Sequence, residues 1–364
     1  MIVIVALVLI GIVLFTDDRG MRGDVLDVTR NVTTVGVVMS GPRDDDGWGT
    51  AHFRALEALK DDLNLRIIYR ESVPTDERCI PVVEEVISEG ATIVFATSFG
   101  FGAPIVSICD KFPKVAFFHC AGVETRPNLA TYMGRMYQMR YLAGIAAGMQ
   151  TDTGEIGYVA AMPIDEVVRH LNAFTLGVRS VNPDAKVFVA WTNTWIDYNK
   201  ELATAEKLLD SHRIDVIAYH QDSDAVIRAA EMRGIPAIGY NVDKSARFPK
   251  TALTTPMWNW EPFYRRSILA VLEGDFVGRQ YWLGVESEIV NLAPLADFAK
   301  PGIAEAVSKG ESRLREGSWD VFYGPLRDNQ GVLRIEAGTS MTDEQLLNNF
   351  DWYVDGVVIE PIDA

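Results

Sequence analysis

Aromatic side chains recur in polar stretches of this sequence, where packing in a buried core does not explain them. Trp48, for example, stands between two glycines in Gly47-Trp48-Gly49. Planar rings on loops form platforms for flat ligands, and stacking contributes about 1–3 kcal/mol per nucleic-acid base. The chemistry predicted here is therefore binding by stacking. The candidate rings are Trp48, Phe99, Phe101, Trp191, Trp195, Tyr198, Trp258 and Trp260.

Carboxylates accompany these rings, whereas positive charge is scarce. Carboxylate oxygens accept hydrogen bonds from ring N–H groups, exocyclic amines and sugar hydroxyls. A phosphate ligand would need a loop such as GxxxxGK, which does not occur, and an amino-acid ligand would call for an arginine. A nucleobase or nucleoside is favoured, with a sugar as the alternative. The acids are Asp46, Asp197, Asp222 and Asp243, against the cations Arg70 and Lys244; Asp46, in a run of three acids, is expected to be solvated.

These residues follow the strands of a strand–helix pattern that occurs twice. Each gap between apolar runs has room for one helix and two short loops, so each half predicts βαβ units around a parallel sheet. The runs are Val35–Met39, Ile67–Tyr69, Ile93–Ala96 and Val115–Phe118, then Ile156–Val159, Val187–Ala190, Val216–Tyr219 and Ala237–Tyr240.

Ligands of such sheets bind beyond the carboxyl ends of the strands, and two lobes enclose a cleft there. The first helix is expected to begin with Thr50 as its cap, and Leu129–Met136 to carry the chain between lobes. A helix at Met139–Gln150 is rich in small residues suited to close packing. The cleft loops are Ser40–Trp48, Arg70–Pro74, Ser98–Phe101, His119–Gly122, Ala161–Val167, Trp191–Tyr198, Gln221–Asp224 and Asn241–Lys244.

Composition narrows the class of protein. A chain of 364 residues is long enough for about two domains. The net charge of −16 opposes nucleic acid and anionic membranes as partners. Cys79, Cys109 and Cys120 have no zinc spacing, Cys109 and Cys120 are expected to be buried thiols, and no metal or cofactor is predicted. No Gly-x-Ser-x-Gly elbow or other catalytic set occurs, so the sequence predicts a binding protein rather than an enzyme.

The N-terminus departs from this globular pattern. Ile2–Phe15 is an unbroken apolar run, shorter than the roughly 20 residues that span a bilayer. It resembles the hydrophobic region of a secretory signal, although no Lys or Arg precedes it and neither an A-x-A site nor a cysteine follows it. Export or anchoring is expected, with a buried core strand as the alternative.

Several stretches together resemble the basic membrane protein family of ABC-transporter substrate-binding proteins, which includes bacterial purine nucleoside receptors. The resemblance covers about residues 34–290, and the family's lipid-carrying cysteine is missing after the apolar run. The tail from Met341 to Trp352 also looks like the family's C-terminal helix and strand. The stretches are Asp46–His52, Phe95–Phe101, Tyr141–Gly148, Gly157–Ala161, Asn172–Gly177, Trp195–Asp197, His220–Ser223 and Gly239–Asp243.

The resemblance implies a type I periplasmic-binding fold, with two doubly wound, Rossmann-like lobes. It implies a base held between Trp48 and Trp195, and the Trp-x-Asp and His-x-Asp-Ser motifs look closest to members that bind purine bases. The remaining predicted site residues are Asp222 and Asp243 as hydrogen-bond acceptors, Ser98 and Phe99 on the floor, and Gln221, Asn241 and Trp258 nearby.

We therefore expect an extracytoplasmic, monomeric substrate-binding protein that delivers a purine base or nucleoside to an ABC permease, held at the membrane by its apolar segment if that segment stays uncleaved. A membrane-anchored sensor module and a sugar-binding protein of the same fold are the alternatives. The expected division is 1–30 for signal or anchor and linker, 31–133 with about 256–290 for the first lobe, 134–255 with part of the C-terminal region for the second, and 291–364 completing both.

Overall fold

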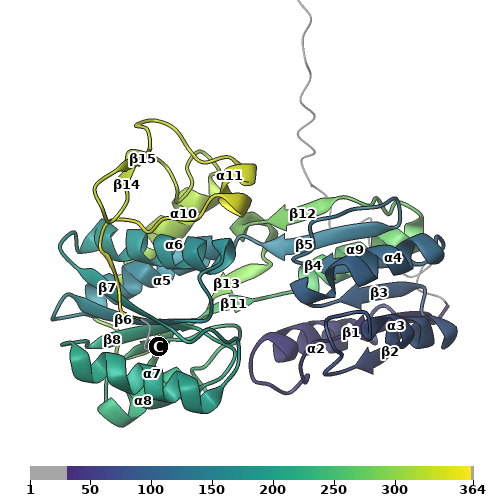
Figure 1. Ribbon diagram of the computed structural model, residues 1–364, viewed down its shortest axis with the longest axis horizontal. Coiled ribbons are helices and arrows are strands. Elements are labelled where there is room, and N and C mark those ends of the chain that lie inside the picture. The colour runs from purple at the N-terminus through teal and green to yellow at the C-terminus, as the bar shows by residue number, and fades with distance from the viewer. Residues whose placement is uncertain (1–30, 362–364) are drawn as a thin grey trace, which may run out of the picture.

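The strands of the computed structural model form two six-stranded sheets, with all neighbouring strands parallel. The structure describes residues 31–361, and the sheets lie side by side as two lobes (Figure 1). The predicted α/β class with two doubly wound lobes is confirmed. The first sheet has the order β12 (Gln280–Leu283), β5 (Leu129–Gly134), β4 (Ala116–Cys120), β3 (Ile93–Ala96), β1 (Thr33–Val38) and β2 (Leu65–Arg70). The second has β10 (Ala252–Thr254), β9 (Ala237–Ile238), β8 (Val216–His220), β6 (Glu155–Ala160), β7 (Lys186–Trp191) and β16 (Val357–Ile359).

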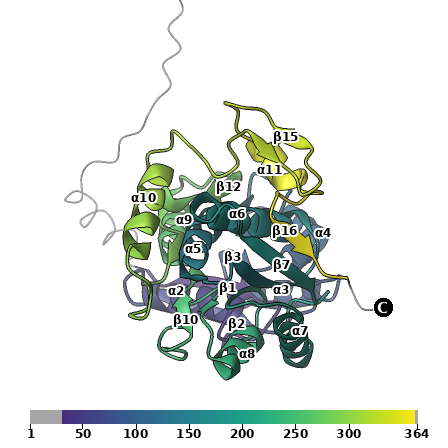
Figure 2. The same cartoon turned by 90° about the vertical axis from the view of Figure 1, so that its left-hand side faces the viewer.

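Helices cover both faces of each sheet, as parallel strands require. In the first lobe, Val37 and Val38 on β1 are both fully buried and belong to separate core clusters, because successive side chains of a strand point to opposite faces. In the second lobe, α5 and α6 lie on one side of the sheet and α7 and α8 on the other (Figures 1 and 2). The helices are α2 (Trp48–Leu59), α3 (Cys79–Ser88), α4 (Gly102–Lys111), α5 (Met136–Gln150), α6 (Asp165–Val181), α7 (Tyr198–Ser211), α8 (Ala225–Arg233), α9 (Glu261–Glu273), α10 (Ile303–Arg315) and α11 (Asp343–Asn348).

The chain passes between the lobes more than once. It leaves the first sheet after β5 for α5, returns from β10 to α9 through β11 (Pro256–Trp258), and leaves again after β12 through β13 (Val290–Leu292) to α10. Strands β11 and β13 pair antiparallel and connect the two lobes (Figure 1). The remaining short elements are η1 (Phe99–Phe101), η2 (Val285–Ser287), β14 (Leu326–Arg327) and β15 (Leu333–Ile335).

The apolar run Ile2–Phe15 lies outside the described residues. Within residues 31–361, no helix combines the length and apolar character needed to cross a bilayer. The three cysteines are free and buried, which confirms the prediction for Cys109 and Cys120. The boundaries given above for the two lobes stay a prediction.

One local expectation was wrong, and another was right about the course of the chain but missed a strand. Thr50 does not cap the first helix: α2 begins at Trp48, and the Asp45 carboxylate accepts the backbone N–H groups of Gly49 and Thr50, at 2.8 and 3.0 Å. An acid just before a helix satisfies the free N–H groups and the positive end of the dipole better than a hydroxyl inside the first turn. The segment 129–136 does carry the chain between the lobes, but most of it is strand β5, buried between β4 and β12, and the crossing lies between Gly134 and Met136.

Glycines let α5 and α6 approach until their backbones touch, as the small residues of the predicted helix suggested. A Cβ on Gly144 of α5 would lie 2.1 Å from the carbonyl oxygen of Phe174, and one on Gly177 of α6 would lie 2.0 Å from that of Tyr141. Both distances are shorter than any van der Waals contact. This contact fixes α6, whose first turns lie at the edge of the second sheet that faces the cleft.

Gly177→Ala is expected to lower the free energy of unfolding by about 2–3 kcal/mol, because overpacking forces the helices apart. Chemical denaturation followed by far-UV circular dichroism measures the change. Gly41→Ala is the matched control, because a Cβ at Gly41 would meet nothing within 4 Å. Equal stability of the two variants would contradict the role given to this contact.

Candidate ligand-binding site

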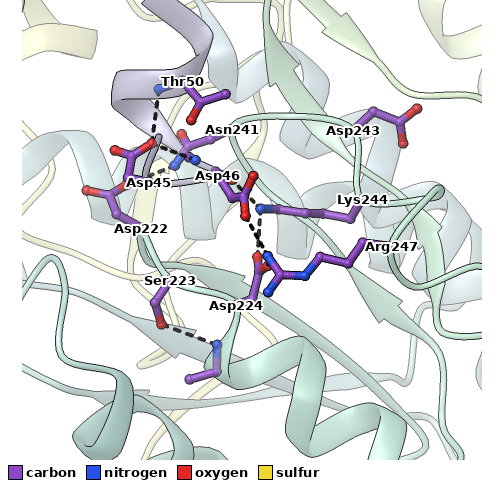
Figure 3. Close-up of polar contacts among 12 residues, drawn as sticks. Asp45, Asp46, Thr50, Asp222, Ser223, Asp224, Asn241, Asp243, Lys244 and Arg247 are labelled. Atoms are coloured by element: carbon purple, nitrogen blue, oxygen red, sulfur yellow. Dashed lines mark hydrogen bonds and ion pairs between the residues drawn. The ribbon is translucent and has the colours of Figure 1, made fainter. Parts of the chain in front are cut away.

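The loop after β1 reaches across to the second lobe. The Lys244 ammonium donates a hydrogen bond to the backbone carbonyl of Asp46, and Arg247 Nη1 lies 2.6 Å from an Asp46 carboxylate oxygen (Figure 3). A Cβ on Gly47 would lie 2.9 Å from the carbonyl oxygen of Asp222. The two lobes are therefore in direct contact at the carboxyl ends of their strands.

Asp224 completes this connection from the second lobe. Its buried carboxylate pairs with Lys244 at 2.6 Å and with Arg247 at 2.5 Å. We call Asp46, Asp224, Lys244 and Arg247 the inter-lobe clamp. The sequence predicted a solvated Asp46, and its side chain is indeed about half exposed, but it is ion-paired. The neighbouring acid Asp197 caps α7, accepting the backbone N–H of Lys200.

Asp222 follows β8 and is held by a chain of hydrogen bonds. Asn241 Nδ2 donates to Asp222 Oδ1 at 2.8 Å, and Trp258 Nε1 donates to Asn241 Oδ1 at 3.1 Å (Figure 3 shows the first of these). Asn241 has φ +69°, a conformation that asparagine tolerates better than most residues. The second carboxylate oxygen of Asp222 has no hydrogen-bond partner within residues 31–361, so it is available to a ligand.

Burial dominates the electrostatics of Asp222. It raises the pKa of this carboxyl to about 7, against the opposing effect of the Asn241 hydrogen bond and with smaller contributions from other acids. No Lys or Arg of the described chain forms an ion pair with it. Asp222 thus changes charge near neutral pH, and a bound N–H donor would favour its ionised form.

Trp195 lies beside Asp222 on the loop after β7. Its backbone carbonyl accepts the N–H of Asp222 at 3.0 Å, and its ring centroid is 5.8 Å from that of His220, the last residue of β8. The ring is only partly buried. The structure therefore brings together the predicted stacking residue and the predicted acceptor of the second lobe.

Trp48 presents its ring from the first lobe. Its Nε1 donates to the carbonyl of Thr97 at 2.7 Å, and its ring stands edge-on to that of Trp258 at 5.5 Å. Trp258 in turn stacks on Trp260 at 4.7 Å, so Trp48 is the partly exposed end of an aromatic cluster. Through Trp258 and Asn241 this cluster is linked to Asp222.

The other predicted residues lie farther from this group. Ser98 Oγ accepts the N–H of Gly100 as the cap of η1, and Phe99 is 65% exposed. Asp243 is exposed, accepts the N–H of Ser245, and points away from Asp222 in Figure 3. Their roles in binding stay predictions.

Gln221 is buried, with its Nε2 donating to Thr192 Oγ1 at 2.6 Å and its Oε1 without a partner within residues 31–361. A role of Gln221 in binding the ligand stays a prediction.

Asp243 and Trp258 line a surface cavity of about 490 Å³ between α2 and α9.

Sequence reasoning missed a cluster of polar side chains next to Trp195. The rings of His170 and His220 stack at 5.0 Å, and an oxygen of Glu166 lies within 4.8 Å of a nitrogen on each. Arg140 lies close by, its Cζ 3.9 Å from the centre of the Tyr240 ring and its Nη1 donating to the carbonyl of Tyr219. Two signals could have found it: an arginine inside an otherwise apolar helix, and a glutamate and histidine one helical turn apart beside a predicted cleft loop.

These three donors meet a distance condition for a metal ion, but the arrangement does not fit one. The two imidazole planes are 20° from parallel, so their in-plane lone pairs do not converge on one point. The charges of Arg140 and Arg169 also act on both rings, and after burial they lower the pKa of His170 and of His220. The same positive charges oppose a divalent cation.

Known proteins with similar sequences match most of this chain. Residues 32–316 match the family described as ABC transporter substrate-binding protein, PnrA-like. The chain is 34% identical over 325 residues to a purine-binding protein of Brucella abortus, which covers 89% of this chain and 92% of that protein. It is 35% identical over 315 residues to a putative ABC transporter glucose-binding protein of Haloferax volcanii, covering 86% and 77%.

A solved structure shows the same fold. An ABC transporter solute-binding protein from Conexibacter woesei superposes with a TM-score of 0.68 at 22% identity, over 79% of this chain and 98% of that one. The periplasmic-binding fold predicted from the sequence is thus confirmed. Proteins of this family bind a small molecule outside the cytoplasm for a permease and are not enzymes. The chain belongs to the PnrA-like family of ABC transporter substrate-binding proteins.

Proposed function

We propose that this protein captures a purine base or nucleoside in its cleft, between Trp48 of the first lobe and Trp195 of the second, and delivers it to an ABC permease. The observation that carries the proposal is the geometry around Asp222. Its backbone N–H donates to the carbonyl of Trp195, and the Asn241–Trp258 chain leads from its carboxylate to Trp48. Two rings and an acceptor suit a flat ligand with N–H donors.

The relatives support two ligand classes. The Brucella relative is named as a purine-binding protein, and the Haloferax relative as a putative glucose-binding protein. A sugar is the second candidate, because hydroxyls donate to carboxylates and sugars also pack on indole rings. The purine is favoured because Trp48 and Trp195 offer a planar, partly buried ring from each lobe. In addition, no Lys or Arg of the described chain forms an ion pair with Asp222, so its carboxylate can accept N–H donors.

We further propose that the mature protein acts as a monomer and that the apolar N-terminal segment directs export or holds the chain at the membrane. A sensor module with the same cleft is the remaining alternative. Titration of the full-length protein with adenine, guanine, adenosine, uridine, ribose and glucose, followed by tryptophan fluorescence and calorimetry, tests the ligand class. Saturable binding of purines alone supports the proposal, and binding of sugars alone contradicts it.

Trp48→Ala and Trp195→Ala should each weaken purine binding at least about tenfold, since each removes one stacking surface. Isothermal titration calorimetry measures the effect, and circular dichroism checks the fold. Trp319→Ala is the control, because this ring packs on Arg313 of α10 rather than on the site residues. Unchanged affinity in both site variants would contradict the sandwich.

The affinity should fall as the pH is lowered. Protonation removes the negative charge of Asp222 and turns one of its acceptor oxygens into a donor. The pKa of this carboxyl is about 7 without ligand, and an N–H donor lowers it in the complex. Binding is therefore strongest above pH 7 and becomes about tenfold weaker between pH 8 and pH 6. Calorimetry across this range measures the slope. Asp222→Asn should bind weakly with a flat profile, and a wild-type profile that is equally flat would contradict the assignment.

The inter-lobe clamp should favour the closed arrangement, which a ligand stabilises by population shift. Arg247 joins Asp46 of one lobe to Asp224 of the other, and its side chain is about half exposed. Its removal is therefore expected to cost little stability but to reduce the closed fraction.

Arg247→Ala should shift the closed-to-open ratio about two- to fivefold toward open, the range expected for exposed ion pairs. Spin labels on Lys114→Cys and Met232→Cys report the distance between lobes by pulsed electron resonance, and the buried native cysteines are poor labelling sites. Arg228→Ala is the control, because Arg228 pairs with Glu231 inside α8. The same distance distribution in both variants would contradict the clamp.

A further inference from the structure

Glu166 is a second carboxyl group in the cleft region, and unlike Asp222 it has no hydrogen-bond partner among the described residues. It lies in the first turn of α6, directly after the loop that follows β6. Burial raises its pKa, yet part of its surface remains accessible. Asp222, Trp48 and Trp195 share this partly accessible state.

Distances place Glu166 beside the site residues of the second lobe: a carboxylate oxygen lies within 4.8 Å of a ring nitrogen of His220, whose ring centroid is 5.8 Å from that of Trp195. Burial dominates the raised pKa of Cys120, at the end of β4 in the first lobe, and the charge of Glu166 is the next contribution. Burial also dominates for Asp222, and there too Glu166 adds to the rise. One carboxylate therefore acts on groups in both lobes, including the predicted acceptor of the ligand.

The surroundings of Glu166 keep it ionisable and in place. The positive charges of Arg169 and Arg140 oppose the effect of burial on its pKa, although neither forms an ion pair with it within residues 31–361. Arg169 is itself anchored, with Nη1 donating to the carbonyl of Leu346 at 2.6 Å. Burial lowers the pKa of His170 and of His220, so both rings are neutral. They therefore do not form an ion pair with Glu166.

We propose that Glu166 is a ligand-binding carboxylate and that, with Asp222, it selects a free purine base over its nucleoside. This inference rests on the proposed function. A free base carries a ring N–H on its imidazole ring in addition to donors on its pyrimidine ring. In a nucleoside the glycosidic bond replaces that N–H. A site with two buried acceptors is satisfied by donors on both edges of the base and rejects a ligand that leaves one acceptor unpaired.

The test removes the donor from the ligand and the acceptor from the protein in turn. Adenine and 9-methyladenine are titrated calorimetrically into the full-length wild type, Glu166→Gln and Glu305→Gln. The last is the matched control, since Glu305 is exposed on α10. The wild type and the control should bind adenine at least tenfold more tightly than 9-methyladenine. Glu166→Gln should lose at least tenfold for adenine and less than threefold for 9-methyladenine, so that discrimination largely disappears.

The possible failures are distinguishable. If Glu166→Gln binds adenine as the wild type does, or weakens both ligands by the same factor, Glu166 does not accept the ring N–H, and purine capture stands without it. Wild-type binding of 9-methyladenine as tight as that of adenine overturns the selection of free bases. Failure of the wild type to bind either purine overturns the proposed function itself.

Discussion

A buried carboxyl group without a cation is the constraint around which this cleft is organised. Moving a carboxylate out of water is unfavourable unless hydrogen bonds or charges replace its hydration. Asp222 receives one hydrogen bond, from Asn241, and Glu166 receives none from the described chain. Nearby, Asp224 shows the satisfied alternative, since Lys244 and Arg247 both pair with it. The contrast separates the acid that is paired with cations at the contact between the lobes from the two acids that we propose as ligand-binding groups.

The two lobes are joined by a backbone contact as well as by side chains. Arg247 pairs with the Asp46 carboxylate, whereas Lys244 donates to the Asp46 carbonyl. Lys244 is buried and pairs with Asp224 inside the second lobe, yet it also donates to the carbonyl of Asp46 in the first. The ion pair with Asp224 compensates the charge of Lys244 within its own lobe. Closure therefore adds a hydrogen bond without burying a new charge, and Gly47 has no side chain to obstruct the approach.

Sequence patterns predicted the repeated strand–helix units because each unit buries its own apolar run. They missed β12 and β16, since short edge strands are defined by the distant segments with which they pair, and they took the six-residue strand β5 for part of the connection between the lobes. They also misassigned Thr50, because the capping acid Asp45 is recognisable only once the loop has folded.

Trp195 and Asp222 could be chosen from sequence, because both follow predicted strands at the same edge of one sheet. Glu166, His170 and Arg140 each left a signal in the sequence, but that they form one cluster could not be predicted, because their proximity depends on how α5 and α6 pack. Periodicity places a residue on a helix face but does not say which helix that face meets.

The C-terminal region, where the strand–helix pattern of the sequence is least regular, holds α6 in position. Asn172 on α6 donates to the carbonyl of Trp352 and accepts the N–H of Val354, while Asp165 accepts the N–H of Phe350. These bonds fix the helix from one side, and the glycine contact with α5 fixes it from the other. A carboxylate in the first turn of a helix held on both sides keeps its position when it loses water. The tail after β13 therefore helps to hold α6, the helix that carries Glu166, although it contributes none of the candidate ligand-binding residues.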